Sequence, residues 1–195
     1  TAINNKGQIV VAAGGTLYLV SPTLPPANAV PVTISASPAN GRALTVVGSG
    51  CRPGSYTTPQ TLQWTPGASC TVAFTSPQST EPGMQYAFTG WQDGNALASR
   101  VISTPGQATT YTAVFSPQHY VTTNAIPQSG GTVGGGGWIT ASSVANLTAM
   151  AAPGYRFVSW TGVDSSAASA SATVTVNSAR SVTANFAEEV PCTFS

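Results

Sequence analysis

One aromatic pattern, Y-x-F-x-x-W, occurs twice in the chain, beginning at Tyr86 and again at Tyr155. Each copy is followed by a polar stretch and then by a strand-like segment that ends in Phe115 or Phe186. The offset between the copies is 69 residues at the Trp (160 − 91) and 71 residues at the final Phe (186 − 115). A near-constant offset across two separate motifs indicates a duplicated structural unit.

Short runs of β-branched and aromatic residues alternate with Pro and Gly turns along the whole chain. Residues 32–36 alternate in this way and are followed by the turn sequence P-A-N-G at 38–41. Residues 76–83 are expected to form a polar loop. The Ala-rich residues 165–172 are broken up by serines and lack an apolar face of helical period. We therefore predict an all-β fold, in which two tandem small repeats are β-grasp-like or sandwich-like and follow an N-terminal β-hairpin or strand segment.

The domain organisation follows from these segments. We assign residues 1–30 to an N-terminal hairpin and Pro-rich linker, 31–117 to repeat one, 118–188 to repeat two, and 189–195 to a tail or the start of a next module. Residues 21–26, S-P-T-L-P-P, predict a stiff linker. The hairpin before it pairs either with the repeats or with another partner's sheet, and its candidate assembly residues are Ile9, Val10, Val11, Leu17, Tyr18 and Leu19.

Each repeat is short and has a small core, so its aromatic residues matter for stability. A buried Trp or Phe contributes on the order of 2–3 kcal/mol. The predicted core residues are those of the duplicated motif: Tyr86, Phe88, Trp91, Phe115, Tyr155, Phe157, Trp160 and Phe186.

Three cysteines are present, and two of them, Cys51 and Cys70, flank an expected hairpin that could place them on adjacent strands. A disulfide between them would close a loop of about 20 residues, worth roughly 3 kcal/mol on chain-entropy grounds. It would also indicate an oxidising compartment. Two buried free thiols are the alternative. Cys192 is left as a free thiol or as half of a bridge to a partner beyond this chain.

Charged residues make up only 6% of the chain, against roughly 25% in an average soluble domain. The six Lys and Arg residues are scattered, which argues against nucleic acid as a partner. No apolar run approaches the ~20 residues of a membrane span. A surface with so few charges has little self-repulsion, so we expect self-association or packing against neighbouring modules. Such a composition suits an extracellular or cell-surface β-protein.

Residues suited to catalysis or metal binding are scarce. His119 is the only histidine, has no acid near it in sequence, and is expected in the link between the repeats. Asp93 and Asp164 follow the two motif Trps, where an Asp that caps a turn fits better than a catalytic carboxylate pair. No calcium-loop pattern occurs, and residues 134–137, G-G-G-G, lack the Lys of a phosphate loop. We predict no enzymatic activity, no cofactor and no metal.

Aromatic residues outside the core are the remaining candidates for ligand binding. Trp138 follows four glycines and is the best candidate for an exposed Trp. With a Tyr such as Tyr120 or Tyr56, it could form a platform on which a sugar ring stacks.

Repeat two resembles the divergent internalin B-type repeat of bacterial secreted and surface proteins. The resemblance lies in G-Y-x-F-x-x-W at 154–160, T-V-T at 173–175 and V-T-A-x-F at 182–186, with G-G-T-V at 130–133 matching the opening hairpin. Repeat one is more diverged, because Gln85 replaces the Gly before the Tyr and residues 52–56 form an insertion. Its front half is similar to hairpins in such repeats of soil acidobacterial surface proteins. The resemblance covers about residues 32–187 and implies location and architecture, since the family has no common catalytic residue.

Two functions are compatible with these observations. The first is a non-enzymatic extracellular structural or adhesive protein, including a self-assembling filament or surface-layer subunit that uses its N-terminal strand. The alternative is a carbohydrate-binding module of a secreted protein, with a polysaccharide as the partner.

Overall fold

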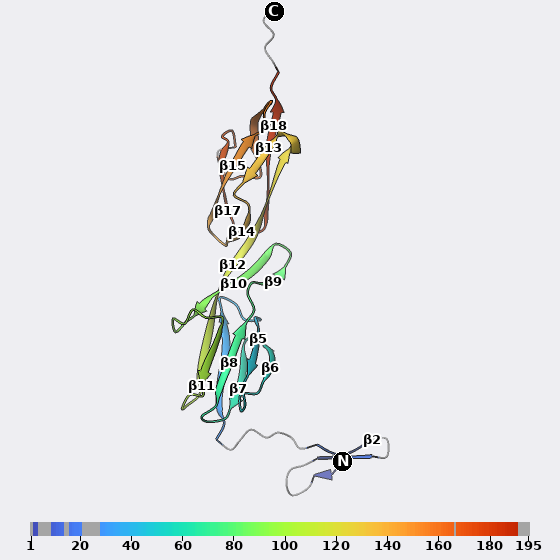
Figure 1. Cartoon of the computed structure of the whole chain (residues 1–195), viewed down its shortest axis with the longest axis vertical. Helices are drawn as coiled ribbons and strands as arrows, with labels where there is room; N and C mark the ends of the chain where they lie inside the picture. Colours follow the sequence, from blue (N-terminus) through green and yellow to red (C-terminus); the bar gives the residue numbers. More distant parts are fainter. Residues whose placement is uncertain (1, 4–8, 14–15, 21–27, 166, 191–195) are drawn as a thin grey trace, which may run out of the picture.

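The computed structural model describes residues 2–3, 9–13, 16–20, 28–165 and 167–190 (Figure 1). Within these residues the secondary structure consists of β-strands and one 3₁₀ turn, η1 (Gln128–Gly130), with no α-helix. The all-β prediction is confirmed. Figure 1 shows the two repeats end to end along the long axis of the molecule.

Repeat one is a sandwich of two sheets. One sheet has the order β7–β4–β12–β10–β9, and the other has the order β11–β8–β5–β6. The strands are β4 (Val30–Ser37), β5 (Ala43–Val47), β6 (Gly54–Thr57), β7 (Gln60–Trp64), β8 (Ser69–Phe74), β9 (Gln78–Glu81), β10 (Met84–Trp91), β11 (Ser99–Ser103) and the first part of β12 (Thr109–Ile126).

Repeat two is a second sandwich, built on the second part of β12. Its sheets have the orders β14–β12–β18–β16 and β13–β15–β17. The strands are β13 (Gly131–Gly134), β14 (Gly137–Thr140), β15 (Val144–Ala151), β16 (Tyr155–Thr161), β17 (Ser171–Thr175) and β18 (Arg180–Glu188). Of the two expected architectures, the described residues therefore form the sandwich, because a sheet rather than a helix covers each core.

The two repeats have the same strand pairing. The first strand of each pairs in parallel with the last, β4 with β12 and β12 with β18. The motif strands β10 and β16 pair antiparallel with those last strands, and both have a bulge after the motif Phe, Phe88 or Phe157. The offset is 89 residues at the first strands (Val121 against Val32) and 69 at the motif Trps. The difference reflects the additional strands β6 and β9 of repeat one, since β7 pairs with β4 as β14 pairs with β12.

The core of each sandwich follows from strict alternation along its strands. On β4, the inward residues Val32, Ile34 and Ala36 are buried, and the residues between them are not. Apolar residues at every second position fill the space between the sheets, as expected for strands that have one face in a core. The two cores are separate clusters, one in each repeat.

The duplicated aromatic motif closes each core in the same way. Phe88 packs edge-to-face on Phe115 with ring centroids 5.5 Å apart, and Phe157 packs on Phe186 at 6.0 Å. Both motif Trps are buried and donate their indole N–H to a loop carbonyl, Trp91 to Leu97 at 2.9 Å and Trp160 to Ser169 at 2.8 Å. Each Trp therefore fills the core and fixes the loop that follows its strand.

Strand β12 joins the repeats without a break. On one edge of β12, β10 pairs with residues 113 to 119 and β18 pairs from Val121 onward. Between them, the N–H of Tyr120 donates to the carbonyl of Gly83 at 3.0 Å. On the other edge, β4 pairs up to Val114 and β14 pairs from Gln118 to Val121. His119 therefore lies at the junction of the repeats, as expected, but inside a paired strand rather than in a linker.

Two other local expectations need correction. Cys51 lies in the loop after β5 rather than on a strand adjacent to Cys70. Residues 76–83, expected as a polar loop, contain the short strand β9, whose residues Gln78 and Glu81 pair with β10. Both differences arise from tertiary pairing that local residue preferences do not encode.

The N-terminal strands form a sheet of their own. The expected hairpin is β2 (Ile9–Ala13) paired with β3 (Thr16–Val20), and β1 (Ala2–Ile3) pairs with the other edge of β2. The turn at Gly14-Gly15, the Pro-rich linker and Cys192 lie outside the described residues.

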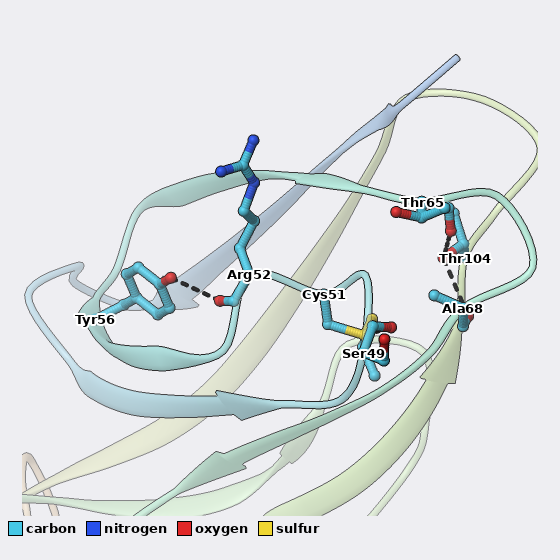
Figure 2. Close-up of a disulfide and its surroundings, with 8 residues drawn as sticks. Ser49, Cys51, Arg52, Tyr56, Thr65, Ala68 and Thr104 are labelled. Carbon is cyan, nitrogen blue, oxygen red and sulfur yellow. Dashed lines mark hydrogen bonds between the residues drawn. A yellow bond between two sulfur atoms is a disulfide. The ribbon is translucent and has the colours of Figure 1, made fainter. Parts of the chain in front are cut away.

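A disulfide joins Cys51 to Cys70 in repeat one (Figure 2). It ties the loop after β5 to the start of β8, and both cysteines are fully buried. The same loop is held by the hydroxyl of Tyr56, which donates to the carbonyl of Arg52 at 2.6 Å. Nearby, the hydroxyl of Thr104 donates to the carbonyls of Thr65 and Ala68 at 2.9 and 3.0 Å. The bridge therefore anchors the part of repeat one that has no counterpart in repeat two.

Removal of this disulfide is expected to destabilise repeat one. For a loop of 19 residues, we expect the free energy of unfolding to fall by about 3 kcal/mol. The measurement is denaturant unfolding of the Cys51→Ala/Cys70→Ala variant, in a Cys192→Ser background that removes thiol exchange. The background protein treated with reductant serves as the control, and an unchanged midpoint after reduction would contradict the prediction.

Candidate functional site

A surface groove lies where the two repeats meet. It has a volume of about 600 Å³ and is lined by Pro82, Gly83, Tyr120, Thr122, Trp138, Ala179, Arg180 and Ser181. Strands β12, β14 and β18 and the β9–β10 turn supply these residues, together with Ala179, which precedes β18. Two residues expected to bind a ligand, Tyr120 and Trp138, are brought together here.

Alternation along β12 explains why Tyr120 points outward. Val121 faces the core of repeat two and is buried, so Tyr120 and Thr122 lie on the opposite face of the sheet. Trp138 is the direct cross-strand partner of Tyr120 on β14. The ring centroids are 5.1 Å apart at an interplanar angle of 70°. Tyr120 is 41% exposed and Trp138 is 39% exposed, so the pair forms an open aromatic platform.

The glycines before Trp138 allow β14 to reach β12. A Cβ at Gly135, where φ is +93°, would lie 2.0 Å from the carbonyl oxygen of Asn146. At Gly136 a Cβ would lie 2.8 Å from the carbonyl oxygen of Val121. Only glycine fits such close backbone approaches, and the turn therefore determines the position of Trp138.

Repeat one has no equivalent aromatic pair. Strand β7 pairs with β4 as β14 pairs with β12, and the equivalent cross-strand pair is Pro31 with Gln63. The fold of the repeat therefore does not require two aromatic rings at this place. Their presence is a property of repeat two alone.

The side of the groove is also a contact between the repeats. A Cβ at Gly83 would lie 2.7 Å from the Cβ of Ala179, so repeat one approaches repeat two closely at this point. The carbonyl of Gly83 also accepts the N–H of Tyr120. The geometry of the groove therefore depends on the relative position of the repeats.

The charge in the groove is balanced. Arg180 donates to Asp164 at 3.0 Å and to the carbonyl of Gly162 at 2.9 Å. Asp164 also accepts the backbone N–H of Thr175 at 2.6 Å. This N–H and, second, the Arg180 guanidinium lower the pKa of the Asp164 carboxyl below its usual value of 3.8. The guanidinium in the groove is thus neutralised by a carboxylate that stays ionised.

Repeat one contains a similar ion pair away from this groove. Arg100 binds both carboxylate oxygens of Asp93, at 2.9 and 2.8 Å, and lies over the rings of Trp91 and Tyr111. The hydrogen bond from Arg100 is the largest cause of the lowered pKa of Asp93. Both Asp residues also accept a backbone N–H, the role that the sequence suggested for them, but their arginine partners were not anticipated.

The other residues considered for function lie elsewhere. Tyr56 is half-buried beside the disulfide loop, and Trp64 is fully buried in the core of repeat one. His119 pairs with Met84 on β10 and Ile139 on β14. Among the predicted core residues, Trp91, Phe115, Trp160 and Phe186 are buried, whereas Tyr86, Phe88, Tyr155 and Phe157 are partly buried against the core.

Side chains that commonly bind metal ions do not cluster in the part of the chain that the structure describes. Within that part, no group of three or more His, Cys, Asp or Glu residues could hold a metal ion. None of the described helical segments has the length and apolar character needed to span a bilayer.

Comparison with known protein families identifies repeat two. Residues 121–190 match the family of the divergent InlB B-repeat domain. The expected resemblance is therefore confirmed for one copy, which covers the second part of β12 through β18. Repeats of this kind are typical of bacterial surface or secreted proteins, and the family is a repeat domain rather than an enzyme family. Searches of curated proteins and of solved structures found no match.

Several groove residues were not indicated by the sequence. Thr122 lies on β12, and Arg180 and Ser181 lie at the start of β18, before the expected strand at 182–186. The parallel pairing that brings β18 beside β12 was not expected. The usable signal was the alternation of V-x-A-x-F at 182–186, which places Ser181 on the outer face. No sequence pattern pointed to Gly83, because its role arises only from its contact with the other repeat.

The lowered pKa of Asp164 predicts a pH dependence of stability. A carboxyl with a depressed folded pKa contributes stability above its usual pKa and loses it as the pH falls through the folded value. We expect the Tm to decrease below about pH 4, and the Asp164→Asn variant to show a weaker decrease. Thermal unfolding across this pH range is the measurement. Glu81→Gln, at an exposed acid on β9, is the control, and an equal effect of both substitutions would refute the prediction.

Proposed function

We propose that this chain is a non-enzymatic structural segment of an extracellular protein. In this proposal the two repeats act as one stiff unit, and the N-terminal strands join the sheet of a neighbouring copy. The observation that carries the proposal is strand β12, which belongs to both repeats.

A hinge between two domains needs residues whose backbone can rotate. Along one edge of β12, the backbone is hydrogen-bonded first to β10, then to the Gly83 carbonyl, and then to β18. This edge therefore has a backbone partner throughout the junction. The 18 residues of β12 span about 60 Å at the usual rise of a strand. The contact of Gly83 with Ala179 supports the junction from the side. Bending here would break backbone hydrogen bonds and separate packed surfaces.

An extracellular location is supported by two independent observations. The matched family is a repeat of bacterial surface-type proteins. The Cys51–Cys70 disulfide persists in oxidising compartments and is rare in reducing ones. A chain with only 6% charged residues also suits a protein that packs against neighbouring copies or modules.

The N-terminal sheet supports the assembly part of the proposal. Among the described strands, β3 pairs only with β2, so its outer edge is open to another strand. Strand addition at such an edge supplies backbone hydrogen bonds between chains. The apolar sequences I-V-V-A-A and T-L-Y-L-V favour a β-partner over solvent.

Stiffness is tested by a distance distribution across the junction. We expect spin labels at the exposed positions of Val47 in repeat one and Met150 in repeat two to give one narrow distribution of label-to-label distances. The measurement is pulsed electron paramagnetic resonance. A label pair within repeat one, at Val47 and Leu97, gives the width expected for a rigid unit. A distribution across the junction much broader than this control would show a hinge and overturn the proposal.

Assembly is tested by light scattering and electron microscopy at increasing concentration. We expect the average particle mass of the full chain to increase with concentration. A Leu17→Lys/Leu19→Lys variant should stay monomeric, because charges on an edge strand oppose edge-to-edge pairing. The control, Val101→Lys/Val144→Lys, adds the same charge at exposed positions of the repeats. A full chain that stays monomeric, or equal effects of both double variants, would contradict the assembly role.

A further inference from the structure

We propose that the groove of Tyr120 and Trp138 binds a neutral polysaccharide. This inference goes beyond the structural role and does not depend on assembly through the N-terminal strands. It would make the junction of the repeats a ligand-binding site, with the aromatic pair as its platform.

The first argument is that folding does not explain the aromatic pair. Tyr120 and Trp138 lie on the outer face of the sheet, and each leaves about two fifths of its surface in solvent. Repeat one forms the same pairing with Pro31 and Gln63 at these positions. Two large exposed rings bring little to the core, so their placement in a groove favours a binding role.

The second argument is the chemistry around the rings. A pyranose has C–H faces that pack on an aromatic ring and hydroxyl groups that form hydrogen bonds at its rim. The pair offers one ring against the edge of the other, at 70°, which provides a floor and a side wall. Thr122 and Ser181 are exposed register partners on β12 and β18, and their hydroxyls can donate to or accept from sugar hydroxyls.

The third argument concerns charge and size. The one cation of the lining, Arg180, is paired with Asp164, so the groove favours a neutral ligand over an acidic one. Eight residues line the groove, whereas a stable protein interface uses roughly 20–30 residues on each side. A narrow ligand such as a glycan chain therefore fits this surface better than a folded protein partner.

Trp138 provides a built-in reporter for binding. The other three Trp residues, Trp64, Trp91 and Trp160, are at most 5% exposed. We expect acrylamide to quench mainly Trp138, and a bound neutral glycan to protect it. The probes are cellohexaose, mannohexaose and N-acetylchitohexaose, with oligogalacturonate as an acidic comparison. Protection by at least one neutral probe, and none by the acidic probe, is the expected result.

Variants then locate the site by calorimetry with the neutral probe that protects Trp138. We expect Trp138→Gln and Tyr120→Thr each to weaken binding about ten-fold or more while leaving the Tm nearly unchanged. The control Met150→Gln replaces an exposed apolar residue elsewhere on repeat two and should leave both quantities unchanged.

Three results would overturn the proposal. One is the absence of protection by all neutral probes at millimolar concentration. Another is glycan binding that is not weakened by Trp138→Gln and Tyr120→Thr, or binding of the acidic probe without binding of any neutral probe. The third is a loss of self-association in the Trp138→Gln variant without any glycan binding by the unmodified chain, which would make the aromatic pair a contact between copies.

Discussion

The uninterrupted pairing of β12 is the constraint on which the rest of the structure depends. This strand is the last of repeat one and the first of repeat two, and β4, β10, β14 and β18 all pair with it. Because its alternation continues through the junction, Phe115 faces the first core and Val121 faces the second from the same side of the strand. One strand thus sets the register of both sandwiches and the position of the groove between them.

Duplication preserved the interior of the repeat and left its surfaces free to differ. Both copies keep the motif Trp with its indole hydrogen bond, the Phe pair and the bulge after the motif Phe. Repeat one adds strands β6 and β9 and the disulfide that anchors the loop before β6. Repeat two instead has the glycine turn that brings Trp138 beside Tyr120. The difference in repeat one concerns stability, and the difference in repeat two is the basis of the proposed ligand-binding site.

Predictions from the sequence were most accurate for features that depend on nearest neighbours. Period-two alternation and Pro/Gly turns identified the strands, and the two motifs revealed the duplication. Predictions that depended on distant pairing were less accurate, as for β9 and for the link around His119. Of the groove, the sequence pointed to Trp138 and Tyr120 separately. It did not indicate Thr122, Ser181 and Arg180, which join them only because β18 pairs in parallel with β12.

The sequence by itself determined the all-β class, the two copies and which side of each strand is apolar, because these follow from local periodicity. Only the tertiary structure decided that the repeats share a strand rather than a linker. Strand sharing depends on hydrogen bonds between residues far apart in the chain, such as the one from Tyr120 to Gly83. The groove exists for the same reason, since Gly83 and Ala179 come into contact across 96 positions of sequence (179 − 83).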